Sequence, residues 1–279
     1  MKLPMPEQND APILIVDLEA TCWESSRLPN GERQSIGNME IIEFGCALAT
    51  RTGELLDSRS FLVRPVRNPD LSAFCRSLTG ISQAMVNAAP PYPEVVRALD
   101  EWLGQPAESL IWCSWGNYDR HHIQAESEAH GIAPRFLSCP HLNLKRIWRR
   151  STGQKKKTGL ASALAFHNLA FEGRPHRGVD DARNIVRLLP FMDWELEAEL
   201  LRGSLRMSEK EHDNRAEVSR AARLTAQAET VFGNVEAARR WLSKPKKRLS
   251  GLSPNEAMKD ERGAELVDQL LKQIDSGHF

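Results

Sequence analysis

The hydrophobic residues of the first 65 positions occur in short runs rich in β-branched side chains. Runs of this kind fall at residues 11–18, 40–49 and 58–65, between polar segments that contain Gly, Pro or Asn. Each run is typical of a β-strand. A Thr52-Gly53 turn joins the second run to the third. Because the connections are short, we expect the three strands to form an antiparallel meander.

From residue 93 onward the hydrophobic residues follow the spacing of helices. Val95, Leu99 and Leu103 share one face of a helix predicted at 93–103, which begins with Pro93. A fourth strand is expected at 110–115, and helices are expected at 117–131, 141–150, 159–170 and 179–192. Strands followed by alternating strands and helices indicate an α/β fold, with a mixed sheet and helices packed on it.

After residue 192 the strand signals end and the composition becomes rich in Glu, Arg and Ala. We predict one domain over residues 1–192, a helical linker over 193–230 and a small all-α domain over 231–279. In the last segment, apolar residues around Trp241 and around Leu270 form two helical faces. Helices this small usually need a partner surface or dimerisation to bury enough apolar area.

Composition and charge exclude several classes of protein. The 279 residues are 41% hydrophobic and 27% charged, with 37 basic and 37 acidic side chains, so no global basic field attracts nucleic acid. The five Cys form no CxxC pair, which argues against a disulfide framework or zinc site and for a reducing compartment. The chain has no secretory signal and no apolar run of membrane-spanning length, so we expect a soluble, cytoplasmic protein that binds no membrane.

Asp17 and Glu19 end the first predicted strand. Residues two apart in a strand point to the same face, so the two carboxylates lie side by side and repel each other. The usual remedies are a raised pKa or a divalent cation, and hard oxygen ligands suit Mg²⁺ or Mn²⁺. This pattern alone leaves a metal site and a solvated strand end equally open.

Further along the chain, two more carboxylates and a histidine strengthen the metal hypothesis. Asp119 begins the helix after the fourth strand, and Asp181 lies in the first turn of the last helix of this half. Either aspartate could serve only to stabilise its helix N-terminus. Four carboxylates at the ends of adjacent elements match what a two-metal site needs. His176, in the loop before Asp181, is placed to deprotonate an attacking water.

Seven segments taken together resemble the DEDDh 3′–5′ exonucleases, in particular the Eri-type branch that includes three-prime histone mRNA exonuclease. These segments are VDLEATCWE (16–24), MEIIEFGCAL (39–48), FLVRP (61–65), LSAFCRSLTGIS (71–82), CSWGNYD (113–119), KTGLASAL (157–164) and GRPHRGVDDARNI (173–185). They occur in the family's order over residues 11–192. The resemblance implies a ribonuclease H-like fold, with a mixed sheet and flanking helices.

The resemblance also implies a catalytic set and a mechanism. The family's motifs fall on Asp17, Glu19, Asp119, His176 and Asp181, with the four carboxylates as ligands of two Mg²⁺ or Mn²⁺ ions. Asp180 is adjacent but does not fit the spacing. Hydrolysis of the last phosphodiester bond by a metal-activated water, with its proton passing to the histidine, would release 5′-mononucleotides. The implied substrate is single-stranded nucleic acid, with RNA favoured over DNA.

Residues that flank the motifs are candidates for gripping the substrate. Ala20, Trp23, Met39, Trp115 and Tyr118 are the predicted substrate-binding residues, because aromatic faces near the site can stack the terminal base. Core packing is the alternative role of these side chains. The stretch 145–157 holds seven basic residues and no acidic ones, and it is either a phosphate track or a solvated charged surface.

The C-terminal segment resembles a second family, the toxin-binding domain of Xre/MbcA/ParS-type antitoxins. The resemblance rests on VFGN, AARRWL, KPKKRLSGLSP and ERGAELVDQLLKQID, within residues 231–279. It implies a toxin-like protein partner or a homodimer formed through this domain. Residues 202–230 show no helix-turn-helix that would bind an operator. A binding protein that acts through its helical tail is therefore the alternative to an exonuclease that degrades RNA or DNA.

Overall fold

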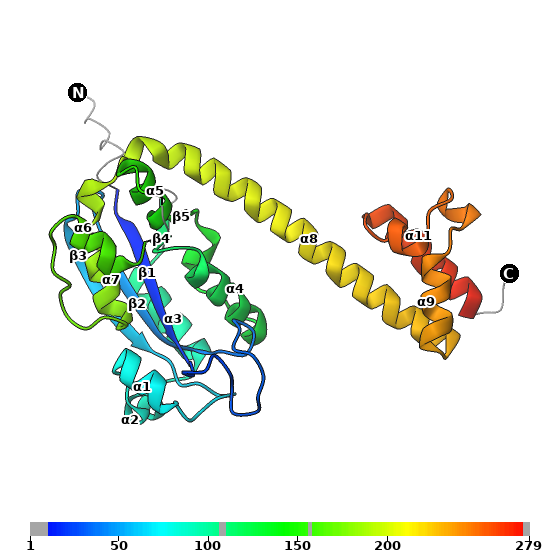
Figure 1. Ribbon diagram of the computed structural model, residues 1–279, viewed down its shortest axis with the longest axis horizontal. Helices are drawn as coiled ribbons and strands as arrows, with labels where there is room; N and C mark the ends of the chain where they lie inside the picture. Colours follow the sequence, from blue (N-terminus) through cyan, green and yellow to red (C-terminus); the bar gives the residue numbers. More distant parts are fainter. Residues whose placement is uncertain (1–10, 106–109, 156–157, 276–279) are drawn as a thin grey trace. The chain divides into compact units, whose positions relative to one another are not determined.

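The computed structural model describes residues 11–105, 110–155 and 158–275, and the chain divides into two compact units (Figure 1). The first unit is Met1–Ser204 and the second is Leu205–Phe279. The division falls inside helix α8 (Glu197–Phe232). The predicted domain boundary after residue 192 lies before this helix and the one after residue 230 lies inside its last turn, and both stay predictions. Each unit is described by itself below.

The first unit is built on a five-stranded sheet, whose mixed character and first four strands the sequence predicts. The strands are β1 (Ile13–Ala20), β2 (Ile41–Ala49), β3 (Leu55–Leu62), β4 (Ile111–Ser114) and β5 (His141–Asn143). Their order is β3-β2-β1-β4-β5; the first three pair antiparallel, and β4 pairs parallel with both β1 and β5. The meander is confirmed, and the parallel half of the sheet requires the helical connections that precede β4 and β5.

Two strand predictions were wrong in detail. β3 begins at Leu55, three residues before the predicted strand, because the Thr52-Gly53 turn leads directly into it. Its side chains are mostly exposed at the sheet edge, so hydrophobicity gave little signal for its bounds. β5 occupies 141–143, where a helix was predicted, since the apolar spacing of the following helix extends backwards through this short strand.

Helices cover both faces of the sheet (Figure 1). They are α1 (Ala73–Thr79), α2 (Gln83–Ala88), α3 (Tyr92–Leu103), α4 (Tyr118–His130), α5 (Leu144–Ser151), α6 (Leu160–Phe166) and α7 (Gly178–Val186). α6 and α7 end earlier than predicted, because the chain turns into 3₁₀ or irregular structure after them. α1 and α2 were not predicted; each is shorter than two turns and depends on a serine N-cap, Ser72 or Ser82.

Alternate residues of β1 enter opposite cores. Ile13 and Ile15 pack with the buried residues of α5, α6 and α7, whereas Leu14 and Val16 pack with those of α3 and α4. This follows from the two-residue period of a strand. The next odd positions are Asp17 and Glu19, so both carboxylates extend the face of β1 that α7 covers.

The second unit is all-α, as predicted. The C-terminal part of α8 packs with α9 (Val235–Ser243), α10 (Pro254–Ala257) and α11 (Glu261–Asp275). Asn234 caps α9, and a Ser253–Glu256 capping box starts α10. Leu224, Leu242 and Leu271 lie in the core of this unit. No helix among the described residues is long and apolar enough to cross a membrane.

Candidate active site

β1 carries the first two predicted site residues. Asp17 is half-buried, and the side chain of Glu19 is largely enclosed. Between Glu19 and Ala20 the pairing of β1 with β2 shifts register, a local irregularity of the kind found beside active sites. Glu19 lies directly opposite Glu43 of β2, so acidic side chains gather at this end of the sheet.

Asp119 reaches the same place from the start of α4. Its Oδ1 accepts the backbone N–H of Leu18 at 3.2 Å, and Leu18 lies between the two acidic residues of β1. The side chain is buried, although its helix position alone fits an exposed N-terminal aspartate. The contact ties α4 to β1 and brings a third carboxylate to the site.

The loop before α7 brings His176 and Asp181 together. The backbone N–H of His176 donates to Oδ2 of Asp181 at 3.2 Å. The neighbouring Asp180 is held elsewhere: it accepts the backbone N–H of Arg174 at 3.0 Å and pairs with Arg183 at 3.4 Å. Asp181, rather than Asp180, is therefore the aspartate of α7 that faces the cluster.

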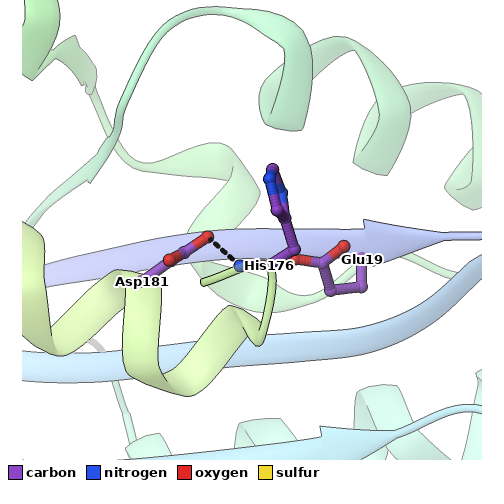
Figure 2. Close-up of side chains that lie close together, drawn as sticks. All are labelled: Glu19, His176 and Asp181. Atoms are coloured by element: carbon purple, nitrogen blue, oxygen red, sulfur yellow. Dashed lines mark hydrogen bonds between the residues drawn. The ribbon is translucent and has the colours of Figure 1, made fainter. Parts of the chain in front are cut away.

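Three of the predicted residues form a possible metal-binding group. One ligand atom each of Glu19, His176 and Asp181 lies within 4.8 Å of the others. Figure 2 shows the two carboxylates on either side of His176, whose ring points upward in this view. Asp17 and Asp119 are electrostatically coupled to this group. The structure thus brings all five predicted residues into one site, and their catalytic and ligand roles stay predictions.

The electrostatics of the site are those of crowded anions. Burial, followed by repulsion from Asp119 and Asp181, raises the pKa of Asp17 well above its ordinary value. Burial and the charge of Asp181 raise the pKa of Glu19 to about 9. Burial raises the pKa of Asp119 to about 6 and that of Asp181 to about 7, while hydrogen bonds oppose both shifts. A divalent cation among these oxygens relieves the repulsion, and hard carboxylate ligands fit Mg²⁺ or Mn²⁺.

The predicted substrate-binding residues fall in two places. Ala20, Trp23 and Met39 belong to one apolar cluster beside the end of β1. Tyr118 joins them, because its hydroxyl lies 4.0 Å from Sδ of Met39 and its ring is exposed. Trp115 lies apart, buried in the core formed with α5, α6 and α7. Four of the five residues therefore lie in or against one apolar cluster next to the carboxylates; whether they bind substrate stays a prediction.

The basic stretch 145–157 is only partly available for phosphate. The charge of Lys145 is close enough to Asp119 to favour its ionised form, so this lysine borders the site. Trp148 is buried in the core, and Arg150 pairs with Glu199 at 2.9 Å. Lys155 is exposed. The predicted positions 156 and 157 lie outside the described residues.

Sequence reasoning missed Glu43, which is fully buried in β2 and hydrogen-bonded to the start of α7. Its signal was a charged residue in the middle of the apolar run IIEFGCALA. A carboxylate in a buried strand needs partners from elsewhere in the chain, and those partners become visible only in the folded structure.

Comparison with family models supports both sequence resemblances. A model described as an exonuclease (RNase_T) matches residues 14–189. The model of the antitoxin Xre/MbcA/ParS C-terminal toxin-binding domain matches residues 227–277. The first match spans β1 to the turn after α7 and therefore contains every predicted site residue.

Individual proteins agree with the first match. The chain is 32% identical to mouse ERI1 exoribonuclease 3 over 195 residues, covering 67% of this chain and 55% of that protein. It is 30% identical to the 3′-5′ exonuclease eri1 of Schizosaccharomyces pombe, covering 64% of this chain and 67% of that protein. The nuclease domain of 3′hExo, a DEDDh family member bound to rAMP, superposes with a TM-score of 0.56 at 26% identity, over 68% of this chain and 93% of that one. The chain thus spans about half the length of the mouse relative, and the ribonuclease H-like fold is confirmed.

Proposed function

The chain belongs to the RNase_T exonuclease family, and from this membership we propose that it is a divalent-metal-dependent 3′–5′ exonuclease. It hydrolyses phosphodiester bonds from the 3′ end of single-stranded nucleic acid and releases 5′-mononucleotides. The observation that supports this most directly is the gathering of Glu19, His176 and Asp181, with Asp17 and Asp119 beside them. Separate elements supply these groups, and sheet packing alone gives no reason for burying so many carboxylates together.

In this proposal the carboxylates bind metal ions and the histidine transfers a proton. The carboxylates of Asp17, Glu19, Asp119 and Asp181 hold two Mg²⁺ or Mn²⁺ ions. When bound, such ions polarise the scissile phosphate and lower the pKa of water. His176 is exposed at the rim of the cluster and accepts the proton of the attacking water. The terminal nucleotide lies against the exposed ring of Tyr118 and the apolar cluster that contains Ala20, Trp23 and Met39.

RNA is the favoured substrate, and DNA is the alternative. The relatives named above include an exoribonuclease, and the 3′hExo nuclease domain holds a ribonucleotide, rAMP. A protein distinguishes RNA from DNA at a given site through contacts to the 2′-hydroxyl. We therefore expect the RNA form of a sequence to be degraded faster than its DNA form.

The decisive experiment uses the purified full chain and 5′-labelled RNA and DNA oligonucleotides of one sequence. Each is incubated with Mg²⁺, with Mn²⁺ or with a chelator, and the products are separated by length. We expect a ladder of labelled products that shortens one nucleotide at a time from the 3′ end, and no reaction in chelator. Shortening from the 5′ end, or equal rates with and without chelator, would contradict the proposal.

A second function is supported by the match of residues 227–277 to an antitoxin toxin-binding domain. We propose that this unit binds a toxin-like protein or a second copy of the chain. Capture of partners by the full chain, compared with a chain ending before residue 227, tests this proposal. A partner or dimer present only with the full chain supports it, and identical behaviour of the two chains contradicts it.

A further inference from the structure

Glu43 is a carboxylate that takes no part in the predicted ligand set, yet it lies next to it. It is in β2, opposite Glu19 in the strand register, and its side chain is 0% exposed. A buried carboxylate is costly unless its oxygens are hydrogen-bonded or paired with a cation. The partners of its two oxygens therefore decide what this residue does.

Both oxygens of Glu43 are held by the segment that follows His176. Oε2 accepts the backbone N–H of Gly178 at 3.0 Å, and Oε1 pairs with Nε of Arg177 at 3.2 Å. From β3, the hydroxyl of Ser60 donates to Oε1 at 2.5 Å. One carboxylate thus connects two strands of the sheet to the first two residues after the histidine.

The backbone of His176 needs such an anchor. Its φ of 60° lies in the left-handed region, which a residue with a Cβ adopts at a cost. Conformations of this kind persist where the surroundings over-determine them. Asp181 accepts the N–H of His176 on one side, and Glu43 holds the two following residues on the other.

The same anchor sets the start of α7. This helix begins at Gly178, so the hydrogen bond from its N–H to Glu43 places the helix N-terminus against β2. Asp181 lies three residues later in the first turn. A shift of the N-terminus would therefore move Asp181 and His176 together relative to Glu19, which is fixed in β1.

We propose that Glu43 is a positioning residue, whose charged carboxylate holds the segment 176–181 so that His176 and Asp181 meet Glu19. The inference rests on the proposed exonuclease function. The charge is required because an amide in this position has one acceptor and one donor group. In one orientation its N–H₂ group would face Arg177 and Ser60, and in the other it would face the N–H of Gly178, so at least one of the three bonds to the segment and β3 would be lost.

The test is the variant Glu43→Gln in the full chain. With a single-stranded oligonucleotide we expect kcat to fall about 10–100-fold, the range seen when a supporting partner of a metal site is removed. KM should stay within about twofold, since no substrate contact is lost. The affinity for Mn²⁺ in the absence of substrate, measured by titration calorimetry, should fall about tenfold. A merely structural role would lower the unfolding temperature and leave kcat and Mn²⁺ binding unchanged.

A matched control is available in the same unit. Glu197→Gln removes the carboxylate of another largely buried ion pair, with Arg51 at 2.8 Å, formed between the start of α8 and the turn after β2, neither of which carries a predicted site residue. It should lower the unfolding temperature and leave kcat and Mn²⁺ affinity at their original values. If Glu43→Gln matches this control in all three measurements, the inference is wrong.

A milder variant keeps the inference testable if Glu43→Gln does not fold. Ser60→Ala removes one donor to Glu43 from an exposed edge position. It should fold, and it should lower kcat about 3–10-fold through the loss of one hydrogen bond to a charged group. Unchanged kcat and unchanged Mn²⁺ affinity in Ser60→Ala would overturn the inference. Absence of metal-dependent trimming by the unmodified chain would instead contradict the proposed function, while Mn²⁺ binding would still test the anchor.

Discussion

Two adjacent aspartates at the start of α7 point in different directions and contact different groups. Asp180 turns toward Arg174 and Arg183, whereas Asp181 turns toward the backbone of His176 and the carboxylates of β1. Successive helical residues differ by about 100° in direction, so only one of the pair faces the sheet. The five-residue spacing from His176 in the sequence indicates the same aspartate.

The two aspartates provide a matched pair of variants. Asp181→Asn should reduce kcat by at least about 10²-fold, because the amide carries no charge for a cation. Asp180→Asn should leave kcat within about threefold, since it loses only a partly exposed ion pair. Initial rates of 3′ trimming in saturating Mn²⁺ check both values. The reverse order of effects would show that the neighbouring aspartate is the ligand.

The raised pKa values predict how stability depends on pH in the absence of metal. A carboxyl whose pKa is higher in the folded than in the unfolded chain loses stability as pH rises through that interval. For Asp119, Asp181 and Glu19 the folded values are about 6, 7 and 9. In chelator the unfolding temperature should therefore fall between about pH 5 and about pH 8.

Bound Mn²⁺ and the substitution Glu19→Gln should each reduce this fall of the unfolding temperature with pH. Mn²⁺ favours the ionised carboxylates, so it should raise the unfolding temperature most at the higher pH. Glu19→Gln removes one titrating group and should flatten the decline in chelator. Thermal unfolding followed by fluorescence measures both effects. An unfolding temperature that rises with pH in chelator would contradict the described electrostatics.

At the scale of elements, the site depends on a helix lying unusually close to a sheet. A Cβ on Gly45 of β2 would lie 1.8 Å from the backbone of Gly178, and a Cβ on Gly178 would lie 2.8 Å from the carbonyl oxygen of Asp17. Because glycine has no side chain, α7 can approach β1 and β2 closely at the level of the carboxylates. Sequence patterns predict β1 and this helix but not the close contact between Gly45 and Gly178, because a glycine in a strand can also mark a bulge or a bend.

Gly45→Ala tests this close approach. The added methyl group must push α7 away from β2, so we expect a loss of about 1–3 kcal/mol or more in the free energy of unfolding. Activity should fall further than stability alone explains, since Asp181 and His176 move with the helix. Gly37→Ala is the control, because a Cβ there would meet no atom closer than 3.9 Å. The free energy of unfolding is measured with denaturant, and the activity as a trimming rate. Equal values of both in the two variants would show that the close approach of α7 to β2 is not required.

At the scale of the whole molecule, each unit has its own hydrophobic core. The first core includes Leu200 in the first turn of α8, and the second includes Leu224 and Ala228 further along the same helix. The division after Ser204 lies between these two sets of packed residues. Two cores of this kind are the mark of units that fold separately.

A chain that ends at Ser204 should therefore fold and keep its nuclease activity. It retains Leu200 and the Arg51–Glu197 ion pair, so we expect cooperative unfolding and a trimming rate within about threefold of the full chain. Circular dichroism and the oligonucleotide assay measure both. A shortened chain that does not fold, or one that loses most of its activity, would show that the helical tail is part of the nuclease.

The sequence by itself determined the mixed sheet, its main helices, the all-α tail and the five residues that meet in the site. These features follow from local periodicity, from residue types and from the spacing of motifs. The structure alone revealed β5, the bounds of β3, the separation of Trp115 from the other candidate contacts, and Glu43. Glu43 contacts Gly178 across 135 positions of the chain, and no local pattern encodes such a partner. Long-range packing decides which buried charges pair and which backbone segments touch. Only that packing removes water from both partners of such a contact at once.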